Sequence, residues 1–313
     1  MGRASRLRMP LAAAVALRGI ATAAAEVASR PLHMVFGAAN IPHPEKAAKG
    51  GEDAFFANDE RGTFGVADGV GGSASAKVDP GMFSREILRR CHESMQPGHA
   101  VADALRMASA ERLELGGSST MLLGQLEPET HKLTMLNLGD SGAMLLRPSF
   151  RRFSRMGNVI WPRLVLRSMD QTHGFNTPYQ TDASDFAGCI ARCDEVSTIA
   201  REGDVLIAAT DGVLDNLHDA QIQTAVAKCM GELRAAEPDA AQKAVDALAD
   251  TLANEAHAVG LKQDEPGVHT PFELAAAQEG YRFLGGKLDD IAVVVGLVRV
   301  GAPPAPRVLC NFE

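Results

Sequence analysis

Short apolar runs of strand length, interrupted by pairs of helix-like segments, constrain the fold of this chain most. The runs alternate in polarity or are continuously apolar, as buried strands are. They lie at residues 54–57, 63–67, 120–126, 133–138, 143–146, 163–166, 205–209 and 291–298. Helical periodicity appears at residues 80–95, 99–115, 219–230 and 240–259. Because helices come in pairs between groups of strands, we predict an α+β layered sandwich and not a doubly wound parallel sheet.

The stretch between residues 148 and 184 shows neither a strand period nor a helix period over most of its length. It is rich in proline, glycine, asparagine and basic residues, and it separates two groups of predicted strands. We expect an irregular loop here. A loop of this size inside a compact domain usually has a function.

The composition narrows the class of protein. A chain of 313 residues with 46% hydrophobic content can bury a large core. Its formal net charge of -8 argues against a broad basic surface, so we expect no nucleic-acid partner. The five cysteines are scattered and odd in number, which indicates reduced thiols. No apolar stretch approaches the ~20 residues of a membrane span, and we expect a soluble monomer.

The first residues differ in composition from the rest. Several arginines lie in an alanine-rich stretch, and no acidic residue precedes Glu26. This pattern matches an organelle transit peptide at residues 1–30, for a mitochondrion or a chloroplast. A secretory signal is the alternative, but Arg18 interrupts its apolar run. We therefore divide the chain into a transit peptide, one catalytic domain at residues 31–300 and a C-terminal tail at residues 301–313.

Acidic residues recur where predicted strands meet glycine or another acid. A single Asp-Gly pair is most often only a turn. Here two strand-Asp-Gly units, at Asp68 and Asp211, occur together with the pairs Glu52-Asp53 and Asp289-Asp290. Carboxylates that converge from strand ends form an oxygen-rich site suited to hard divalent cations. The pattern therefore indicates metal-assisted chemistry.

In chain order these motifs resemble those of the type 2C metal-dependent serine/threonine protein phosphatases. The motifs are Gly51-Glu52-Asp53, Val66-Ala67-Asp68-Gly69, Gly117-Ser118-Ser119-Thr120, Leu138-Gly139-Asp140-Ser141-Gly142, Ala209-Thr210-Asp211-Gly212 and Asp289-Asp290-Ile291-Ala292. The resemblance spans residues 41–298. Residues 41–44, 50–56 and 174–180 are similar to the organellar branch of that family.

The resemblance implies a four-layer α-β-β-α sandwich with a central antiparallel β-sandwich and a dinuclear Mn²⁺ or Mg²⁺ site. Asp68 would bridge the two ions and, with Asp211, would be essential for catalysis. The resemblance further implies that Asp289 binds the same ion as Asp211, and that the Gly69 carbonyl and Glu52 bind the other ion. Asp53 would hold metal-bound water. Asp140 would bind a weaker third ion. Water between the ions would attack phosphoserine or phosphothreonine in protein substrates without a covalent intermediate.

Two departures from the family pattern affect the substrate side. Val70 stands where many members carry a histidine that is a proposed general acid, and valine cannot donate a proton. Lys46 and Lys49 lie where many members have a phosphate-binding arginine, so both are candidates for that role. His173 is a third candidate for substrate binding. A catalytically weak regulatory or binding module and a hydrolase of small phosphate esters remain alternatives.

Overall fold

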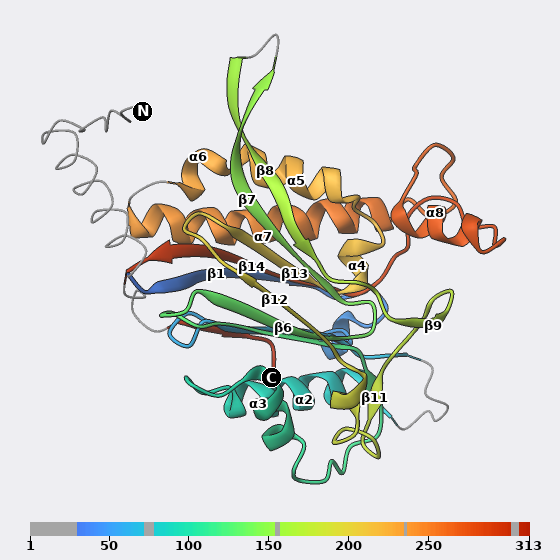
Figure 1. Ribbon diagram of the computed structural model, residues 1–313. Helices are drawn as coiled ribbons and strands as arrows, with labels where there is room; N and C mark the ends of the chain where they lie inside the picture. Colours follow the sequence, from blue (N-terminus) through green and yellow to red (C-terminus); the bar gives the residue numbers. More distant parts are fainter. Residues whose placement is uncertain (1–29, 72–77, 154–156, 235–236, 302–306) are drawn as a thin grey trace, which may run out of the picture.

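Two antiparallel sheets lie face to face between two layers of helices (Figure 1). The computed structural model describes residues 30–71, 78–153, 157–234, 237–301 and 307–313. The predicted transit peptide lies outside these described residues, apart from Arg30. The predicted α+β sandwich, with its four α-β-β-α layers, is confirmed by this arrangement.

The first sheet has five strands in the order β1-β14-β13-β7-β8, and every neighbouring pair is antiparallel. Its strands are β1 (Leu32–Ile41), β7 (Gly142–Phe153), β8 (Gly157–Arg167), β13 (Val205–Ala209) and β14 (Ile291–Val300). The long β7–β8 hairpin extends beyond the body of the sheet (Figure 1).

The second sheet has six strands in the order β12-β6-β5-β3-β2-β15, again antiparallel throughout. Its strands are β2 (Asp53–Asn58), β3 (Thr63–Asp68), β5 (Met121–Leu126), β6 (Lys132–Leu138), β12 (Asp194–Ile199) and β15 (Val308–Cys310). Two small strand pairs lie outside the main sheets. They join β9 (Thr172–Gly174) to β10 (Thr177–Pro178), and β4 (Ser118–Ser119) to β11 (Thr181–Asp182).

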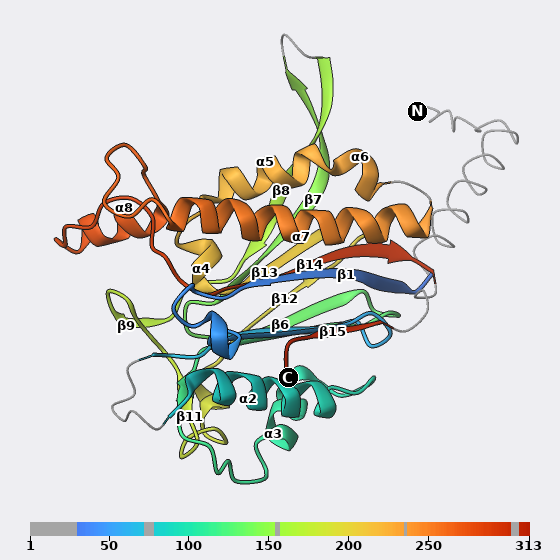
Figure 2. The ribbon, with the colours of Figure 1, turned by 180° about the vertical axis from the view of Figure 1, so that it is seen from behind.

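The helices cover the outer faces of both sheets (Figure 2). The α-helices are α2 (Pro80–Ser94), α3 (Val101–Ala108), α4 (Asp211–Leu214), α5 (Asp219–Lys228), α6 (Met230–Leu233), α7 (Pro238–Gly260) and α8 (Pro271–Gln278). Short 3₁₀ helices occupy η1 (Ala47–Lys49) and η2 (Cys189–Arg192). Helices α5 and α7 lie on the first sheet, whereas α2 and α3 lie on the second.

Strand β14 shows why the sequence folds into layers. Successive side chains of a strand point to opposite faces of its sheet. Ala292 and Val294 join the cluster between the two sheets, whereas Val293 and Val295 join the cluster that includes the apolar side of α7. Both faces of this central strand are therefore buried, which explains its continuous apolar sequence.

The prediction of an irregular loop at residues 148–184 is wrong for most of that range, which forms strands. Strand β7 continues to Phe153, β8 begins at Gly157, and three short strands follow. Pro148 pairs with Pro162 in the β7–β8 register, so the prolines did not end the strands. Strands β1 and β12 and helix α8 were also not expected. Within the expected C-terminal tail, residues 308–310 form the edge strand β15.

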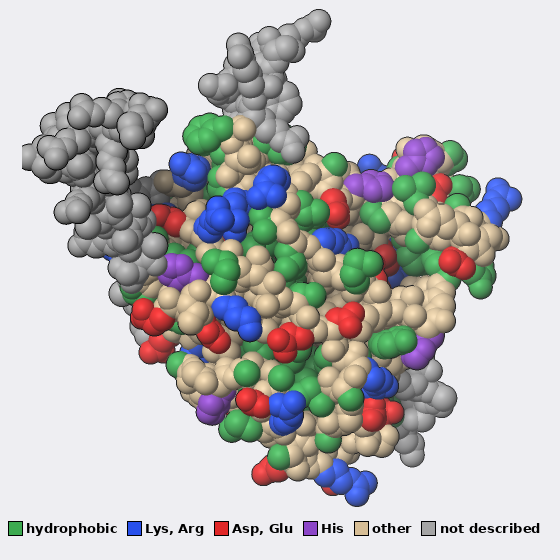
Figure 3. Space-filling model, in the orientation of Figure 1, with side chains coloured by type: hydrophobic (Ala, Val, Ile, Leu, Met, Phe, Trp, Pro, Cys, Tyr) green, Lys and Arg blue, Asp and Glu red, His purple; other side chains and the backbone are tan. Residues whose placement is uncertain are grey.

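Acidic and basic side chains are interspersed over the described part of the face seen in Figure 3. Among the described residues, no helix has both the length and the apolar character required to cross a bilayer.

Candidate metal centre

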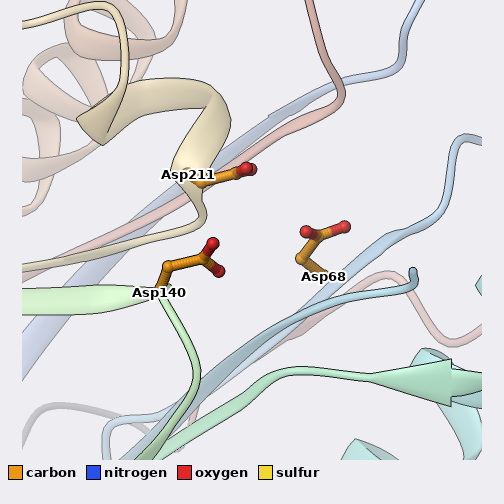
Figure 4. Close-up of side chains that lie close together, drawn as sticks. All are labelled: Asp68, Asp140 and Asp211. Carbon is orange, nitrogen blue, oxygen red and sulfur yellow. The ribbon is translucent and has the colours of Figure 1, made fainter. Parts of the chain in front are cut away.

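Three carboxylates from separate parts of the chain converge at one end of the β-sandwich (Figure 4). Asp68 ends β3, Asp140 follows β6, and Asp211 begins α4, separated from β13 only by Thr210. One oxygen of each lies within 4.8 Å of the others. The two sheets therefore contribute carboxylates to a single space, as the strand-end pattern predicted.

Hydroxyl groups fix the main chain of Asp68. The Asp68 N–H donates to Thr120 Oγ1 at 3.0 Å, and the Ser119 hydroxyl donates to the Asp68 carbonyl oxygen at 2.8 Å. The Thr120 and Ser141 hydroxyls are themselves 2.8 Å apart. These contacts tie β3 to the neighbouring segments, so the Asp68 carboxylate is presented from rigid backbone.

The glycines after the two aspartates allow close backbone packing. A Cβ atom on Gly69 would lie 2.6 Å from the Pro80 carbonyl oxygen and 2.7 Å from that of Glu52. A Cβ atom on Gly212 would lie 1.9 Å from the Asp290 carbonyl oxygen. No side chain fits at either distance. The two Asp-Gly pairs therefore bring the segments that carry Glu52 and Asp290 against the carboxylates.

Asp53 is buried beside these groups, with its side chain held from one side only. The Thr210 hydroxyl donates to Asp53 Oδ2 at 2.7 Å, while Oδ1 has no hydrogen-bond partner in the described structure. Thr210 Oγ1 also accepts from the Ala292 N–H at 3.0 Å. A buried carboxylate oxygen without a donor is costly, and a cation would satisfy it. Asp140 Oδ1 is unpartnered in the same way.

The two candidate phosphate-binding lysines lie in different environments. Lys46 Nζ is 2.5 Å from Glu52 Oε2 and 2.8 Å from Asp290 Oδ2, so it reaches the edge of the acidic site. Lys49 Nζ is 3.8 Å from Asp79, and its side chain is 73% exposed. The structure therefore brings Lys46, but not Lys49, to the acidic site. The Asp290 carboxylate also accepts from the His43 N–H, which fixes the segment that carries Lys46.

A third lysine lies within the site. Lys287 Nζ is 2.5 Å from Asp211 Oδ2, 2.7 Å from Asp215 Oδ2 and 3.3 Å from Asp289 Oδ2. Burial alone would lower the pKa of Lys287, but these three carboxylates outweigh it and raise the pKa well above its ordinary value. The ammonium therefore stays charged.

The aspartates of the site lie so close together that they resist ionisation at the same time. Burial, reinforced by neighbouring carboxylates, raises the pKa values of Asp68 and Asp53 well above their ordinary range. For the same reasons the pKa of Asp140 rises to about 8. Burial and Asp211 raise the pKa of Asp215 to about 7, despite the opposing effect of Lys287. A divalent cation would reverse these shifts, so the residues fit a hard metal ion.

A cavity of about 330 Å³ adjoins the acidic site. It lies between the β9–β10 hairpin and α8, and its lining includes Asp140, Asp215 and His173. The His173 ring packs on Tyr179 with centroids 4.2 Å apart. The structure therefore places His173 in a cavity next to the acids, where a substrate group would have room.

Three residues of the site were missed from the sequence: Thr210, Asp215 and Lys287. Asp215 had a detectable signal, because residues four apart on a helical turn share a face and Asp211 was already a candidate. Thr210 lies within the motif Ala209-Thr210-Asp211-Gly212, but no role was assigned to it. Lys287 had no signal, since an ammonium near an acidic motif is equally common at the surface.

No family model matches this chain. It is 36% identical to "Probable protein phosphatase 2C 55" of Arabidopsis thaliana over 280 residues, which cover 88% of this chain and 54% of that protein. It is 32% identical to "Probable protein phosphatase 2C 26" of the same plant, covering 85% of this chain and 84% of the relative. The chain spans little more than half the length of several curated relatives it matches.

Solved structures share the fold. The X-ray structure of the photosystem II phosphatase PBCP matches with a TM-score of 0.69 and 27% identity, covering 84% of this chain and 98% of that one. The catalytic domain of the serine threonine protein phosphatase PstP, in complex with two manganese ions, has a TM-score of 0.52 and 16% identity. It covers 86% of this chain and 99% of its own, and at that identity it shows the fold alone. Together with the sequence matches, these results show that the chain belongs to the protein phosphatase 2C family.

Proposed function

We propose that this chain hydrolyses phosphoserine and phosphothreonine in proteins with the help of divalent metal ions. The observation that carries the proposal is the convergence of Asp68, Asp140 and Asp211, with one oxygen of each within 4.8 Å of the others. Membership of the protein phosphatase 2C family supports this chemistry. A regulatory module without turnover is less well supported, because every acidic residue expected for the metal site is present.

Mn²⁺ or Mg²⁺ fits the oxygen ligands of this site. Asp68 would bridge two ions. Asp211 and Asp289 would bind one of them, Glu52 and the Gly69 carbonyl the other, and Asp140 a weaker third. When bound, such ions activate water and polarise a phosphoryl group.

The remaining residues of the site would orient the attacking water and bind the substrate phosphate. The Thr210 hydroxyl donates to the Asp53 carboxylate and orients it, and Asp53 would in turn accept a hydrogen bond from the attacking water. Lys46 would bind a substrate phosphate oxygen as a point charge, because an ammonium lacks the fork of a guanidinium. Val70 cannot protonate the leaving alkoxide, so we expect that proton to come from water.

The direct test measures phosphate release from phosphoserine and phosphothreonine peptides while Mn²⁺ or Mg²⁺ is titrated into the full chain. We expect release to require metal and to fall by about 100-fold or more in Asp68→Asn and in Asp211→Asn. Metal-independent activity, or normal activity in both variants, would refute the proposal. Faster turnover of phosphorylated metabolites than of phosphopeptides would identify a small-ester hydrolase instead.

We also propose import into an organelle. The support is the basic, acid-poor composition of residues 1–30, together with the resemblance of residues 41–44, 50–56 and 174–180 to the organellar branch of the family. A fluorescent protein fused after residue 30 should enter mitochondria or chloroplasts, and retention in the cytosol would contradict the proposal.

A further inference from the structure

The main chain of Lys287 is fixed to the turn that carries Asp211. The Lys287 N–H donates to Asn216 Oδ1 at 3.0 Å, and Asn216 Nδ2 donates back to the Lys287 carbonyl oxygen at 2.7 Å. The same amide nitrogen donates to the Gly212 carbonyl oxygen at 2.9 Å. Asn216 thus joins the segment before β14 to α4. The root of the lysine side chain is therefore held at a constant position relative to the acids.

The Lys287 ammonium is surrounded by three carboxylates and an aromatic ring. Its nitrogen contacts the carboxylates of Asp211, Asp215 and Asp289 at 2.5, 2.7 and 3.3 Å, and lies 5.0 Å from the centroid of the Phe272 ring. A cation near an aromatic face is stabilised by the ring quadrupole. Only 15% of the side chain is exposed. The Lys287 side chain is therefore a packed part of the site and not a mobile surface side chain.

The ammonium and a metal ion would use the same carboxylates. Asp211 and Asp289 are both residues that we expect to bind metal, and Lys287 already contacts one oxygen of each. A fixed positive charge at this distance also repels a divalent cation. In the absence of metal, however, the ammonium offsets the repulsion among three closely spaced carboxylates. Its effects on the metal-free and metal-bound protein therefore have opposite signs.

We propose that Lys287 is a tethered counter-ion: it holds the metal-binding carboxylates together before metal arrives and weakens divalent cation binding at this edge of the site. Lys287 is thus a positioning residue. The inference rests on the proposed metal-binding function.

The test compares Lys287→Met with Lys49→Met in the full chain. Methionine matches the apolar stem of the lysine up to Cε and lacks the charged nitrogen. Lys49 is a matched control, since its side chain is 73% exposed and lies near Asp79 instead of these acids. The two measurements are the affinity for Mn²⁺ by titration calorimetry and the thermal midpoint with chelator or with saturating Mn²⁺.

We expect Lys287→Met to bind Mn²⁺ about tenfold more tightly than the wild type. Without metal its midpoint should fall by about 5 °C or more, and saturating Mn²⁺ should remove most of that loss. Lys49→Met should change neither quantity. Lys287→Gln, which is neutral but keeps N–H donors, should also bind Mn²⁺ more tightly and provides a second test if Lys287→Met does not fold.

A residue with a purely structural role would lower the midpoint equally with and without Mn²⁺ and leave affinity unchanged. That result, or weaker Mn²⁺ binding by both Lys287 variants, overturns the inference while leaving the proposed phosphatase function intact. If the wild type itself binds no Mn²⁺ or Mg²⁺, both the function and the inference are wrong.

Discussion

Strand β2 has a buried aspartate at each end, and the two differ in their surroundings. Asp53 begins the strand and Asp59 follows its last residue; each is 1% exposed. Each accepts one hydrogen bond, from the Thr210 hydroxyl and the Phe36 N–H respectively. Each also has one oxygen without a hydrogen-bond partner in the described structure.

The two carboxylates differ in the charged groups that surround them. Around Asp53 lie further acids, and burial together with Asp290, Asp289 and Asp211 raises its pKa well above the ordinary value. Burial also raises the pKa of Asp59, but the Phe36 N–H and Arg307 oppose the rise and leave it at about 6. Burial alone therefore does not define a metal site. The accumulation of uncompensated acids does.

The largest effect is expected on Mn²⁺ binding and phosphate release when the Asp53 carboxylate is neutralised. Asp53→Asn should weaken Mn²⁺ binding and slow phosphate release by about 100-fold, because a group expected to hold metal-bound water loses its charge. Without metal the variant should be more stable than the wild type, since one of several crowded carboxylates is gone. Calorimetric titration and thermal unfolding with chelator measure the two effects. Unchanged Mn²⁺ affinity would place Asp53 outside the metal site.

A smaller effect is expected from the hydroxyl that orients Asp53. Thr210→Val keeps the shape of the side chain but removes the donor to Asp53 and the acceptor for the Ala292 N–H. We expect roughly tenfold weaker Mn²⁺ binding. Thr210→Ser, which keeps the hydroxyl, is the control and should stay close to the wild type. Equal losses in both variants would assign the effect to packing and not to the hydrogen bond.

The smallest effect, and one on stability alone, is expected at the other end of the strand. The pKa of Asp59 is about 6 in the folded chain, against 3.8 ordinarily, so folding favours its protonated form. Its contribution to stability is therefore greatest below pH 4, decreases as pH rises toward 6 and is lost above that. Asp59→Asn removes this penalty and keeps an acceptor for the Phe36 N–H.

We expect Asp59→Asn to raise the free energy of unfolding by about 1–2 kcal/mol at pH 7.5 relative to pH 4, with phosphate release unchanged. Denaturant unfolding of wild type and variant at both pH values isolates the Asp59 contribution, because other groups titrate equally in both chains. The same stability difference at both pH values would contradict the expected titration.

The sequence allowed the central strands and the acidic positions to be predicted because both depend on local patterns. Residues 205–209 and 291–298 are continuously apolar, and Asp-Gly after a strand is a compact signal. Strand β12 was missed because its sequence, Asp194–Ile199, is polar and its side chains are mostly exposed. The β7–β8 hairpin was misread because its prolines and arginines resemble loop composition, although the paired strands extend from the body of the sheet.

The pairing of side chains across the site could not be predicted in the same way. Lys46 and Lys49 are three residues apart and were equivalent in sequence, yet only Lys46 contacts Glu52 and Asp290. Their difference depends on the turn of η1 and on the position of β14, which lies far along the chain. Lys287 likewise acquires its role only when α4, α8 and the segment before β14 meet.

The acidic residues of the site come from widely separated points of the chain, and Asp289 lies just before β14, the last long strand. A nascent chain that stops before this point, or a fragment cleaved within the sandwich, lacks part of the binding site. The cost of closing such long loops must be met by the whole fold before the carboxylates meet. Tight binding of a divalent ion would consequently report that a molecule extends past Asp289 and that its sandwich has folded, and would protect such molecules in preference to shorter fragments.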